Sequence, residues 1–190
     1  MRVSRQFEKA LQYTTRIHGG QLRKKTRIPY IAHIFGVTAI AMEYGANETE
    51  AIAALLHDAV EDCGGEERLR DIREKFGDDV ARIVDGCTDT YETPKPEWLK
   101  RKRAYLQHLK DSDSSIRLVS ASDKLHNTRA ILADLRRHGP EVFERFSGKK
   151  DGTLWYYRAL VTAFRQHGDH VDLIEEVDRV VGEIEQLVRE

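Results

Sequence analysis

Apolar residues recur every three to four positions along most of this chain, and no stretch shows a clean alternation of apolar and polar residues bounded by turns. A period near 3.6 residues is typical of an amphipathic helix, whereas alternation is typical of a strand. The pattern therefore predicts an all-α protein, in which polar cap residues, glycines and prolines separate the helices. Helices are expected over residues 4–18, 32–44, 48–62, 67–76, 79–85, 98–110, 116–137, 141–146, 153–167 and 170–188, with a loop over 88–97.

Two of the expected helices are apolar at first and then run into ionisable residues. Ala51–Leu56 precedes His57–Asp62, and Ile116–Ala121 precedes Asp123–Asn127. A helix that is apolar on all sides is typically buried, and buried imidazoles and carboxylates are costly unless their charge is compensated. A bound cation would compensate it. Since residues four apart lie on one helical face, we expect His57 beside Glu61, and Asp58 beside Asp62, with one pair a turn from the other.

A further histidine, His33, falls in the first turn of the expected helix 32–44. Taken singly, these residues have ordinary structural interpretations, in which His33 caps a helix, Asp123 is a satisfied core carboxylate and the acids after His57 face solvent. Taken together they favour a metal site with His33, His57, Asp58 and Asp123 as ligands. Two imidazoles and two carboxylates suit Mn²⁺, Fe²⁺, Co²⁺ or Zn²⁺ better than Mg²⁺ or Ca²⁺. Glu61 and Asp62 are then expected to orient or activate water for hydrolysis.

Composition narrows the class of protein. The 190 residues carry 31 basic and 32 acidic side chains, so no overall charge points to nucleic acid or to an anionic membrane as a partner, and any anion site must be local. The length suits a single domain over residues 1–190. Cys63 and Cys87 form no CxxC pair, and the N-terminus has no signal-peptide core. No apolar run approaches the ~18 residues of a membrane span. We expect a cytoplasmic protein with two free thiols.

The order of these residues resembles a known family. His33, then His57-Asp58, then Asp123 is similar to the H…HD…D pattern of the HD-domain metal-dependent phosphohydrolases. The surrounding motifs further resemble the hydrolase domain of Rel/Spo-type alarmone enzymes, and most of all the stand-alone small alarmone hydrolases. These motifs are His18–Lys24, Pro29–His33, Ala54–Asp62 and Ser122–Asn127, within a core of about residues 16–131.

The resemblance implies a fold, a reaction and a set of site residues. The fold would be a helical bundle of HD-domain type, with about 9–11 helices around a buried metal site and helices 141–188 packed on the motif core. The reaction would be Mn²⁺-dependent hydrolysis of (p)ppGpp at its 3′ position, which releases pyrophosphate and GDP or GTP. The metal ligands and the two catalytic acids would be the residues named above. Arg23 and Lys24 would lie near the guanine and phosphates, and Asn127 would contact the nucleotide.

Alternatives remain open where the sequence departs from the family or is less specific. The loop over residues 23–30 is one residue longer than the family pattern, and Arg27-Ile28 replaces its Gly-Glu. Another nucleotide or phosphomonoester is therefore a second hypothesis for the substrate, and a non-catalytic alarmone sensor is a third. Tyr156 is either a ring for the nucleotide or a core residue. The basic run Lys100–Arg103 either attracts a polyphosphate or is a solvated face. The last helix packs on the core or pairs with a second subunit.

Overall fold

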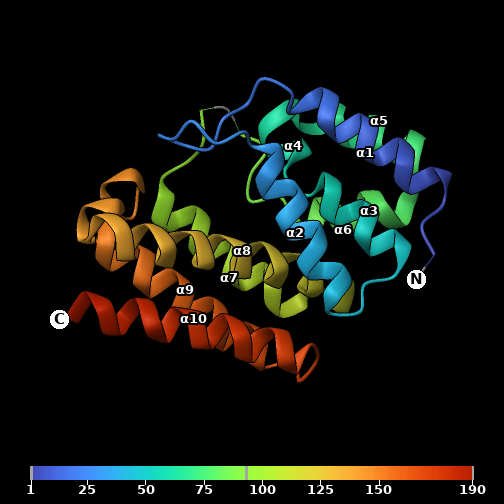
Figure 1. Cartoon of the computed structure of the whole chain (residues 1–190). Coiled ribbons are helices and arrows are strands. Elements are labelled where there is room, and N and C mark those ends of the chain that lie inside the picture. The colour runs from blue at the N-terminus through green and yellow to red at the C-terminus, as the bar shows by residue number, and fades with distance from the viewer. Residues whose placement is uncertain (1, 93, 190) are drawn as a thin grey trace.

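The computed structural model describes residues 2–92 and 94–189, and in this part of the chain the secondary-structure elements are helices joined by loops (Figure 1). Apart from an isolated antiparallel bridge between Leu22 and Pro29, it contains no β-structure. The all-α prediction is confirmed. The elements are α1 (Arg5–Ile17), α2 (Ile31–Glu43), α3 (Glu48–Leu56), α4 (Ala59–Cys63), α5 (Gly65–Phe76), α6 (Asp78–Cys87), α7 (Trp98–Asp111), α8 (Ser114–His138), the 3₁₀ helix η1 (Pro140–Arg145), α9 (Lys149–Arg165) and α10 (Val171–Arg189).

Several helices begin where the sequence places a capping residue. The side chains of Ser4 and Asp113 accept backbone N–H groups in the first turns of α1 and α8. Asn47 and Glu50 form a reciprocal capping box at the start of α3, with bonds of 3.1 and 2.8 Å. Such caps satisfy N–H groups that have no partner inside the helix. Gly139, at φ 72°, ends α8 before Pro140.

One expected element differs in the structure, and another has a tighter helical form than an α-helix. The single helix expected over 48–62 is wrong: α3 ends at Leu56, α4 begins at Ala59, and His57 and Asp58 form the turn between them. Asp58 has φ −99° and ψ −2°, a bridge conformation that interrupts the regular helix. The short helix expected over 141–146 is present as the 3₁₀ helix η1, which begins at Pro140 directly after α8 ends.

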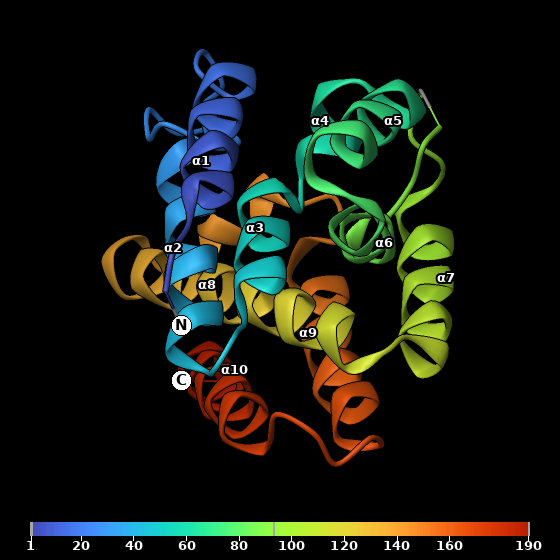
Figure 2. The same cartoon turned by 90° about the vertical axis from the view of Figure 1, so that its right-hand side faces the viewer.

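The long helix α8 lies at the centre of the bundle. It packs against α2, α3, α6 and α10, and Figure 2 shows α1 and α2 on one side of α3, with α4, α5 and α6 on the other. All six residues from Ala51 to Leu56 are buried, as are residues on every side of α8, so both predictions of buried helices are confirmed. These two helices carry His57, Asp58 and Asp123 into the interior.

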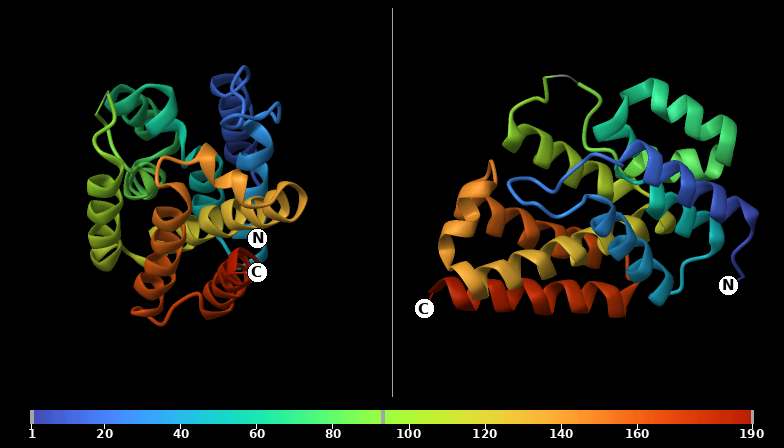
Figure 3. Two further views of the ribbon diagram at one scale, coloured as in Figure 1. Left: turned by 90° about the vertical axis from the view of Figure 1, so that its left-hand side faces the viewer. Right: turned by 45° about the horizontal axis from the view of Figure 1, so that its top comes forward.

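The last helix packs on the rest of the chain. α10 runs along α8 and α9, and both views in Figure 3 place it on the side away from α4 and α5. Its buried face is apolar and consists of Leu173, Ile174, Val177, Val180, Val181 and Ile184. Across the described residues, no helix is both long enough and apolar enough to cross a membrane. Cys63 and Cys87 are free thiols, as expected.

Candidate metal centre and active site

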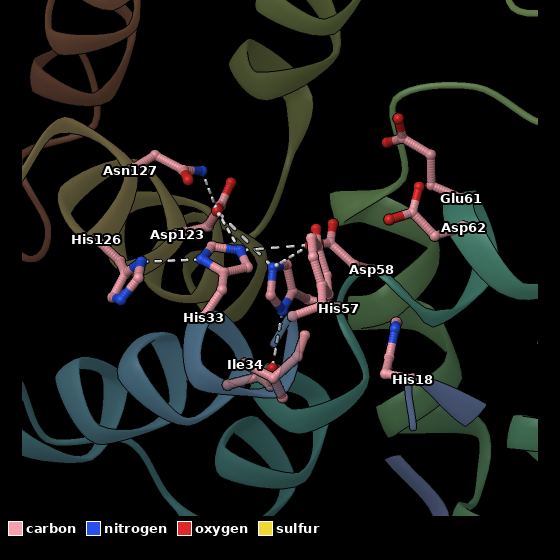
Figure 4. Close-up of polar contacts among 12 residues, drawn as sticks. His18, His33, Ile34, His57, Asp58, Glu61, Asp62, Asp123, His126 and Asn127 are labelled. Atoms are coloured by element: carbon pink, nitrogen blue, oxygen red, sulfur yellow. Dashed lines mark hydrogen bonds and ion pairs between the residues drawn. The ribbon is translucent and has the colours of Figure 1, made fainter. Parts of the chain in front are cut away.

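The four expected metal ligands meet at one point in the interior (Figure 4). His33 comes from the first turn of α2, His57 and Asp58 from the turn after α3, and Asp123 from the middle of α8. His33 Nε2 lies 3.4 Å from Asp58 Oδ2 and 3.3 Å from Asp123 Oδ1. His57 Nε2 lies 3.0 and 3.8 Å from the same two oxygens. Residues that are 90 positions apart in the chain therefore present four donor atoms to one another.

The backbone fixes which nitrogen of His57 faces the centre. His57 Nδ1 lies 2.9 Å from the carbonyl oxygen of Ala54, in the preceding turn of α3. A carbonyl only accepts, so Nδ1 carries the proton and Nε2 keeps its lone pair. The two-residue turn after α3 is what allows His57 and Asp58 to present their side chains to the same centre.

A chain of contacts fixes the other imidazole in the same way. Arg23 Nη1 lies 3.2 Å from His126 Nδ1, and an arginine only donates, so this nitrogen of His126 is an acceptor. It therefore also accepts the Nδ1–H of His33 at 2.9 Å, which leaves His33 Nε2 with its lone pair toward the centre. Burial, then the charges of His33 and Arg23, lowers the pKa of His126 to about 4, in keeping with a neutral ring. Such a partner orients a metal-binding imidazole.

Both carboxylates of the centre are held in their ionised form. Burial raises the pKa of Asp123, but the Lys124 ammonium and the histidines lower it, and the pKa lies well below its ordinary value. The pKa of Asp58 is raised by burial and lowered further by His57, and it is also well below normal. Tyr30 Oη donates to Asp58 Oδ2 at 2.6 Å and orients that group. Burial and then Asp58 raise the Tyr30 pKa, so the phenol remains a donor.

This donor set fits a divalent cation. Each of the two imidazole nitrogens lies 3.0–3.8 Å from the carboxylate oxygens of Asp58 and Asp123, and these lone pairs would repel one another without a positive charge between them. His57 Nε2 is buried and has no hydrogen-bond partner, which is unusual for a core histidine and expected for a ligand. Burial lowers the pKa of His57, but Asp58 and then Asp123 raise it well above normal, so the centre favours positive charge.

The two acids expected to act on water lie one turn further on. Glu61 and Asp62 belong to α4, and Figure 4 shows both side chains apart from His57 and Asp58, so the expected side-by-side pairs do not form. The turn at residues 57–58 breaks the helical register on which that expectation rested. Glu61 Oε1 accepts from Lys95 Nζ at 2.7 Å. Asp62 Oδ2 accepts from the Gln21 side-chain amide at 2.8 Å.

A cavity of about 290 Å³ opens beside the metal centre. Its walls include His33, Asp58 and Asp123 of the donor set, and Glu61 of the two acids. Neither His57, the fourth donor, nor Asp62 is among the described residues that line the cavity. Glu61 is therefore the acid with direct access to a bound substrate.

The expected substrate-binding residues also reach this cavity. Arg23, Lys24, Asn127 and Tyr156 all line it. Arg23 Nη2 donates to Asn127 Oδ1 at 2.8 Å, and the Asn127 amide donates to Asp123 Oδ1 at 2.5 Å. Tyr156 is 6% exposed and lies among aromatic side chains of α7 and α9, so it is both a core residue and a cavity wall.

A second cavity, of about 330 Å³, adjoins the first. The two share Arg23, Lys24, His33, Asn127, Phe146 and Tyr157 as lining residues. Beyond them, the second cavity is lined largely by apolar groups, among them Ile28, Ala32, Ala130 and Ile131. The loop that departs from the family pattern therefore forms part of this wall.

Comparison with known proteins assigns the family. A family model described as "HD domain" matches residues 10–154. This chain belongs to the HD domain family. The resemblance inferred from the H…HD…D pattern is confirmed, and all four expected ligands lie within the matched residues.

Relatives of this HD domain include proteins named as a pyrophosphohydrolase or a pyrophosphokinase of guanine nucleotides. The human protein named guanosine-3′,5′-bis(diphosphate) 3′-pyrophosphohydrolase MESH1 is 37% identical over 140 residues, which are 72% of this chain and 73% of the relative. The Xenopus tropicalis protein of that name is 38% identical over 70% of each chain. A Streptomyces coelicolor GTP pyrophosphokinase is 36% identical over 132 residues, but these are only 15% of its length.

Solved structures show the same fold. A structure described as a metazoan ortholog of SpoT that hydrolyses ppGpp superposes with a TM-score of 0.78 at 28% identity, over 95% of this chain and 96% of the other. A crystal structure of a Listeria monocytogenes protein gives a TM-score of 0.71 at 27% identity, over 83% and 99%. The HD-type bundle expected from the motifs is confirmed.

The HD domain also brings to the site residues that sequence patterns alone scarcely singled out. Lys95 and Asp89, from the loop before α7, contact Glu61 through Nζ and through the backbone N–H. Lys124 and His126 flank the Asp123 ligand, and their places in the motif were the only signal for a role. For Lys95 and Asp89 no such signal exists, because an irregular loop has no period that predicts where its side chains point.

Proposed function

We propose that this protein hydrolyses (p)ppGpp at its 3′ diphosphate, releasing pyrophosphate and GDP or GTP, with a divalent cation held by His33, His57, Asp58 and Asp123. The convergence of these four donors beside a cavity that Glu61 also lines is the observation that carries the proposal. The names of the relatives that match most of their own length supply the substrate. We propose Mn²⁺ as the cation, with Fe²⁺, Co²⁺ and Zn²⁺ as the other metals that suit mixed nitrogen and oxygen ligands.

Different residues of the site have different roles in the proposed reaction. When bound, a divalent cation supplies Lewis acidity, which polarises a phosphoryl oxygen and makes water a better nucleophile at neutral pH. Glu61 lines the cavity and accepts the proton of the attacking water. Asp62 accepts from Gln21 and shares Lys95 with Glu61, so it helps to position Glu61. Arg23 and Lys24 neutralise phosphate charge, and Asn127 links the Arg23 guanidinium to the Asp123 ligand.

The nucleoside has a natural place in the second cavity. The shared lining residues Arg23, Lys24 and Asn127 lie between the metal centre and the apolar walls around Ile28. A nucleotide whose phosphates reach the metal centre can therefore place its base in the adjoining space. Tyr157, which lines both cavities, would contact the sugar or the base.

The departure at residues 27–28 favours one alternative substrate class, another phosphorylated nucleotide. Ile28 lines the cavity proposed for the base, so its side chain bears on base recognition and leaves the chemistry at the metal unchanged. The chain retains both expected catalytic acids, Glu61 and Asp62, and this argues against a non-catalytic sensor. Two free cysteines favour a reducing compartment, and we propose the cytoplasm.

Purified protein tested with ppGpp and each of the four metals decides the proposal. We expect pyrophosphate release with Mn²⁺. The Asp58→Ala variant should lose metal binding and activity together. The Glu61→Gln variant should bind the metal normally and lose about 10²–10⁴-fold in rate, the usual contribution of a general base. Glu66→Gln, an exposed carboxylate one helix further on, is the matched control and should keep full rate.

The outcomes separate the hypotheses. Turnover of other nucleotides with none on ppGpp would replace the proposed substrate. Tight ppGpp binding without turnover under any of the metals would establish the sensor. Full rate in Glu61→Gln would show that this carboxylate is not the base.

A further inference from the structure

One wall of the metal-site cavity carries three cations that the proposed reaction does not use. Arg101 and Lys102 come from the second turn region of α7, and Lys124 from α8 beside the Asp123 ligand. All three line the cavity of about 290 Å³ that the metal donors also line. Two of them belong to the basic run Lys100–Arg103, so the helix turns one half of that run inward.

The inward and outward halves of the run differ sharply in burial. The side chains of Arg101 and Lys102 are 14% and 18% exposed, whereas Lys100 and Arg103 are exposed. Asp89, only 7% exposed, holds both inward cations: it pairs with Arg101 and lies 2.7 Å from Lys102 Nζ. Cations are rarely placed inside a protein unless they have partners or a purpose.

The partners within the wall do not balance its charge. Asp89 is shared by Arg101 and Lys102, and the one other carboxylate near this pair in the described structure is Glu61, 4.0 Å from Arg101 and paired more closely with Lys95 at 2.7 Å. Lys124 Nζ lies 2.5 Å from Asp123 Oδ2, but Asp123 also presents its other oxygen to the metal centre. With the metal charge matched by Asp58 and Asp123, the wall keeps an excess of positive charge in a half-enclosed space, where it attracts anions strongly.

Its hydrogen bonding is also incomplete. Arg101 Nε and the Tyr156 hydroxyl are buried donors without an acceptor in the described structure. Lys102 Nζ lies 4.8 Å from the centre of the Tyr156 ring, and Lys124 Nζ 5.2 Å from that of Tyr105, so aromatic faces support both ammonium groups. Buried polar groups nearly always have partners, and an arginine fork beside lysines is the arrangement that binds phosphate oxygens.

We propose that this wall is a diphosphate subsite, at which Arg101, Lys102 and Lys124 bind a pyrophosphoryl group or inorganic pyrophosphate. Asp89 is a positioning residue that holds the two α7 cations at the cavity. As a part of catalysis the inference rests on the proposed function, since a diphosphate is the group that reaction removes. As a binding site it stands on the charge and burial of the wall, and inorganic pyrophosphate tests it directly.

The experiment compares inward and outward cations of the same helix. Pyrophosphate binding is measured by calorimetry on metal-loaded and metal-free protein, for wild type, Arg101→Gln and Lys102→Gln, with Lys100→Gln and Arg103→Gln as matched controls. We expect the inward variants to weaken binding about tenfold or more, as for the loss of one charge-assisted hydrogen bond, and the controls to change it less than about twofold. Arg101→Lys keeps the charge and the fold, and should retain part of the affinity.

Each outcome bears on the proposal. Equal affinities in the inward variants and the controls would overturn it, as would wild-type affinity in both Arg101→Lys and Arg101→Gln. Should a glutamine variant melt early, Arg101→Lys and Lys102→Arg, compared at a temperature where all are folded, decide the question. Pyrophosphate binding that depends on Arg101 and Lys102, without any ppGpp hydrolysis, would keep the subsite and reject the proposed function. Hydrolysis of ppGpp, together with pyrophosphate binding that does not depend on Arg101 or Lys102, would keep the proposed function and reject the subsite.

Discussion

Gly36 shows how much of the metal centre depends on the size of a single side chain. A Cβ atom built on Gly36, in the middle of α2, would lie 2.2 and 2.3 Å from the Cδ2 and Nε2 atoms of His126. That ring accepts the Nδ1–H of His33 at 2.9 Å and so turns the other nitrogen of His33 toward the metal donors. A glycine inside a helix costs about 1 kcal/mol relative to alanine, and here it leaves room for the ring.

A Gly36→Ala variant is therefore expected to separate helix stability from metal affinity. The better helix former offsets part of the strain, so the free energy of unfolding without metal should change by no more than about 1–2 kcal/mol. Displacement of the His126 ring should weaken Mn²⁺ binding by about 10-fold, as when a partner of a ligand histidine is lost. Calorimetric titration with Mn²⁺ and urea unfolding measure the two effects.

The double variant Gly36→Ala/His126→Ala is the control. It removes the clash but also the partner of His33, so the chain should regain stability without regaining metal affinity. Wild-type affinity in Gly36→Ala would contradict the assigned role of His126.

At the scale of elements, the start of α3 and the turn after it decide where His57 points. The capping box of Asn47 and Glu50 fixes the first turn of α3, and Ala54, near its end, accepts the Nδ1–H of His57. The sequence predicted this cap and the burial of the helix, because both follow from local residue types. It did not predict the turn at residues 57–58. That turn depends on contacts of Asp58 with Tyr30 and His33, both at the start of α2 and distant from it in the chain, and with the neighbouring His57.

Removal of the cap should destabilise the fold without touching the centre directly. Asn47→Ala is expected to lower the free energy of unfolding by about 1 kcal/mol, since an N–H group of the first turn loses its acceptor. Asn47→Asp, which keeps an acceptor oxygen, is the matched control and should lie close to wild type. Urea unfolding at constant pH measures both, and equal stability of the alanine and aspartate variants would argue against the cap.

At the scale of the whole molecule, ion pairs connect the last helix, α10, to α8 and α9. Arg129 of α8 pairs with Glu176 of α10 at 3.0 Å, and Arg136 pairs with Glu183 at 2.6 Å. Arg158 of α9 contacts Glu185 and Asp178 of α10. Since α10 also buries an apolar face on α8 and α9, it belongs to the body that supports Asp123. That residues 1–190 form a single domain stays a prediction from length and composition.

These ion pairs make the free energy of unfolding depend on pH in the acid range. Hydrogen bonds from Arg179, and then from Arg129, outweigh burial and lower the pKa of Glu176 to about 2. A carboxylate whose folded pKa lies below its unfolded value near 4.3 stabilises the fold above that pH and loses the effect as the pH falls through the folded pKa. We expect stability to fall between about pH 5 and pH 2. Glu176→Gln should make the decline shallower.

Urea unfolding across that pH range measures the slope. The exposed neighbour Glu175→Gln is the control and should leave the slope close to wild type. Identical slopes for wild type and Glu176→Gln would contradict the role given to this pair.

Much about this protein follows from the sequence by itself. Apolar periodicity, caps and helix stops are local, and they were enough to predict an all-α fold, most helix boundaries and the two buried helices. The motif residues also indicated a shared site, because ionisable groups at the ends of buried helices need a common partner. They are His33, His57, Asp58 and Asp123. The structure brings these four together as predicted.

Other features were decided only by the tertiary structure. The break at His57–Asp58, the separation of Glu61 from Asp62 at the cavity and the inward face of Lys100–Arg103 all depend on which neighbours surround each side chain. Identical residue types two positions apart, such as Lys100 and Lys102, differ in burial because the helix rotates by about 100° per residue, which places them on nearly opposite faces. Periodicity shows that one of them faces inward, but what the inward one meets depends on packing between segments far apart in the chain.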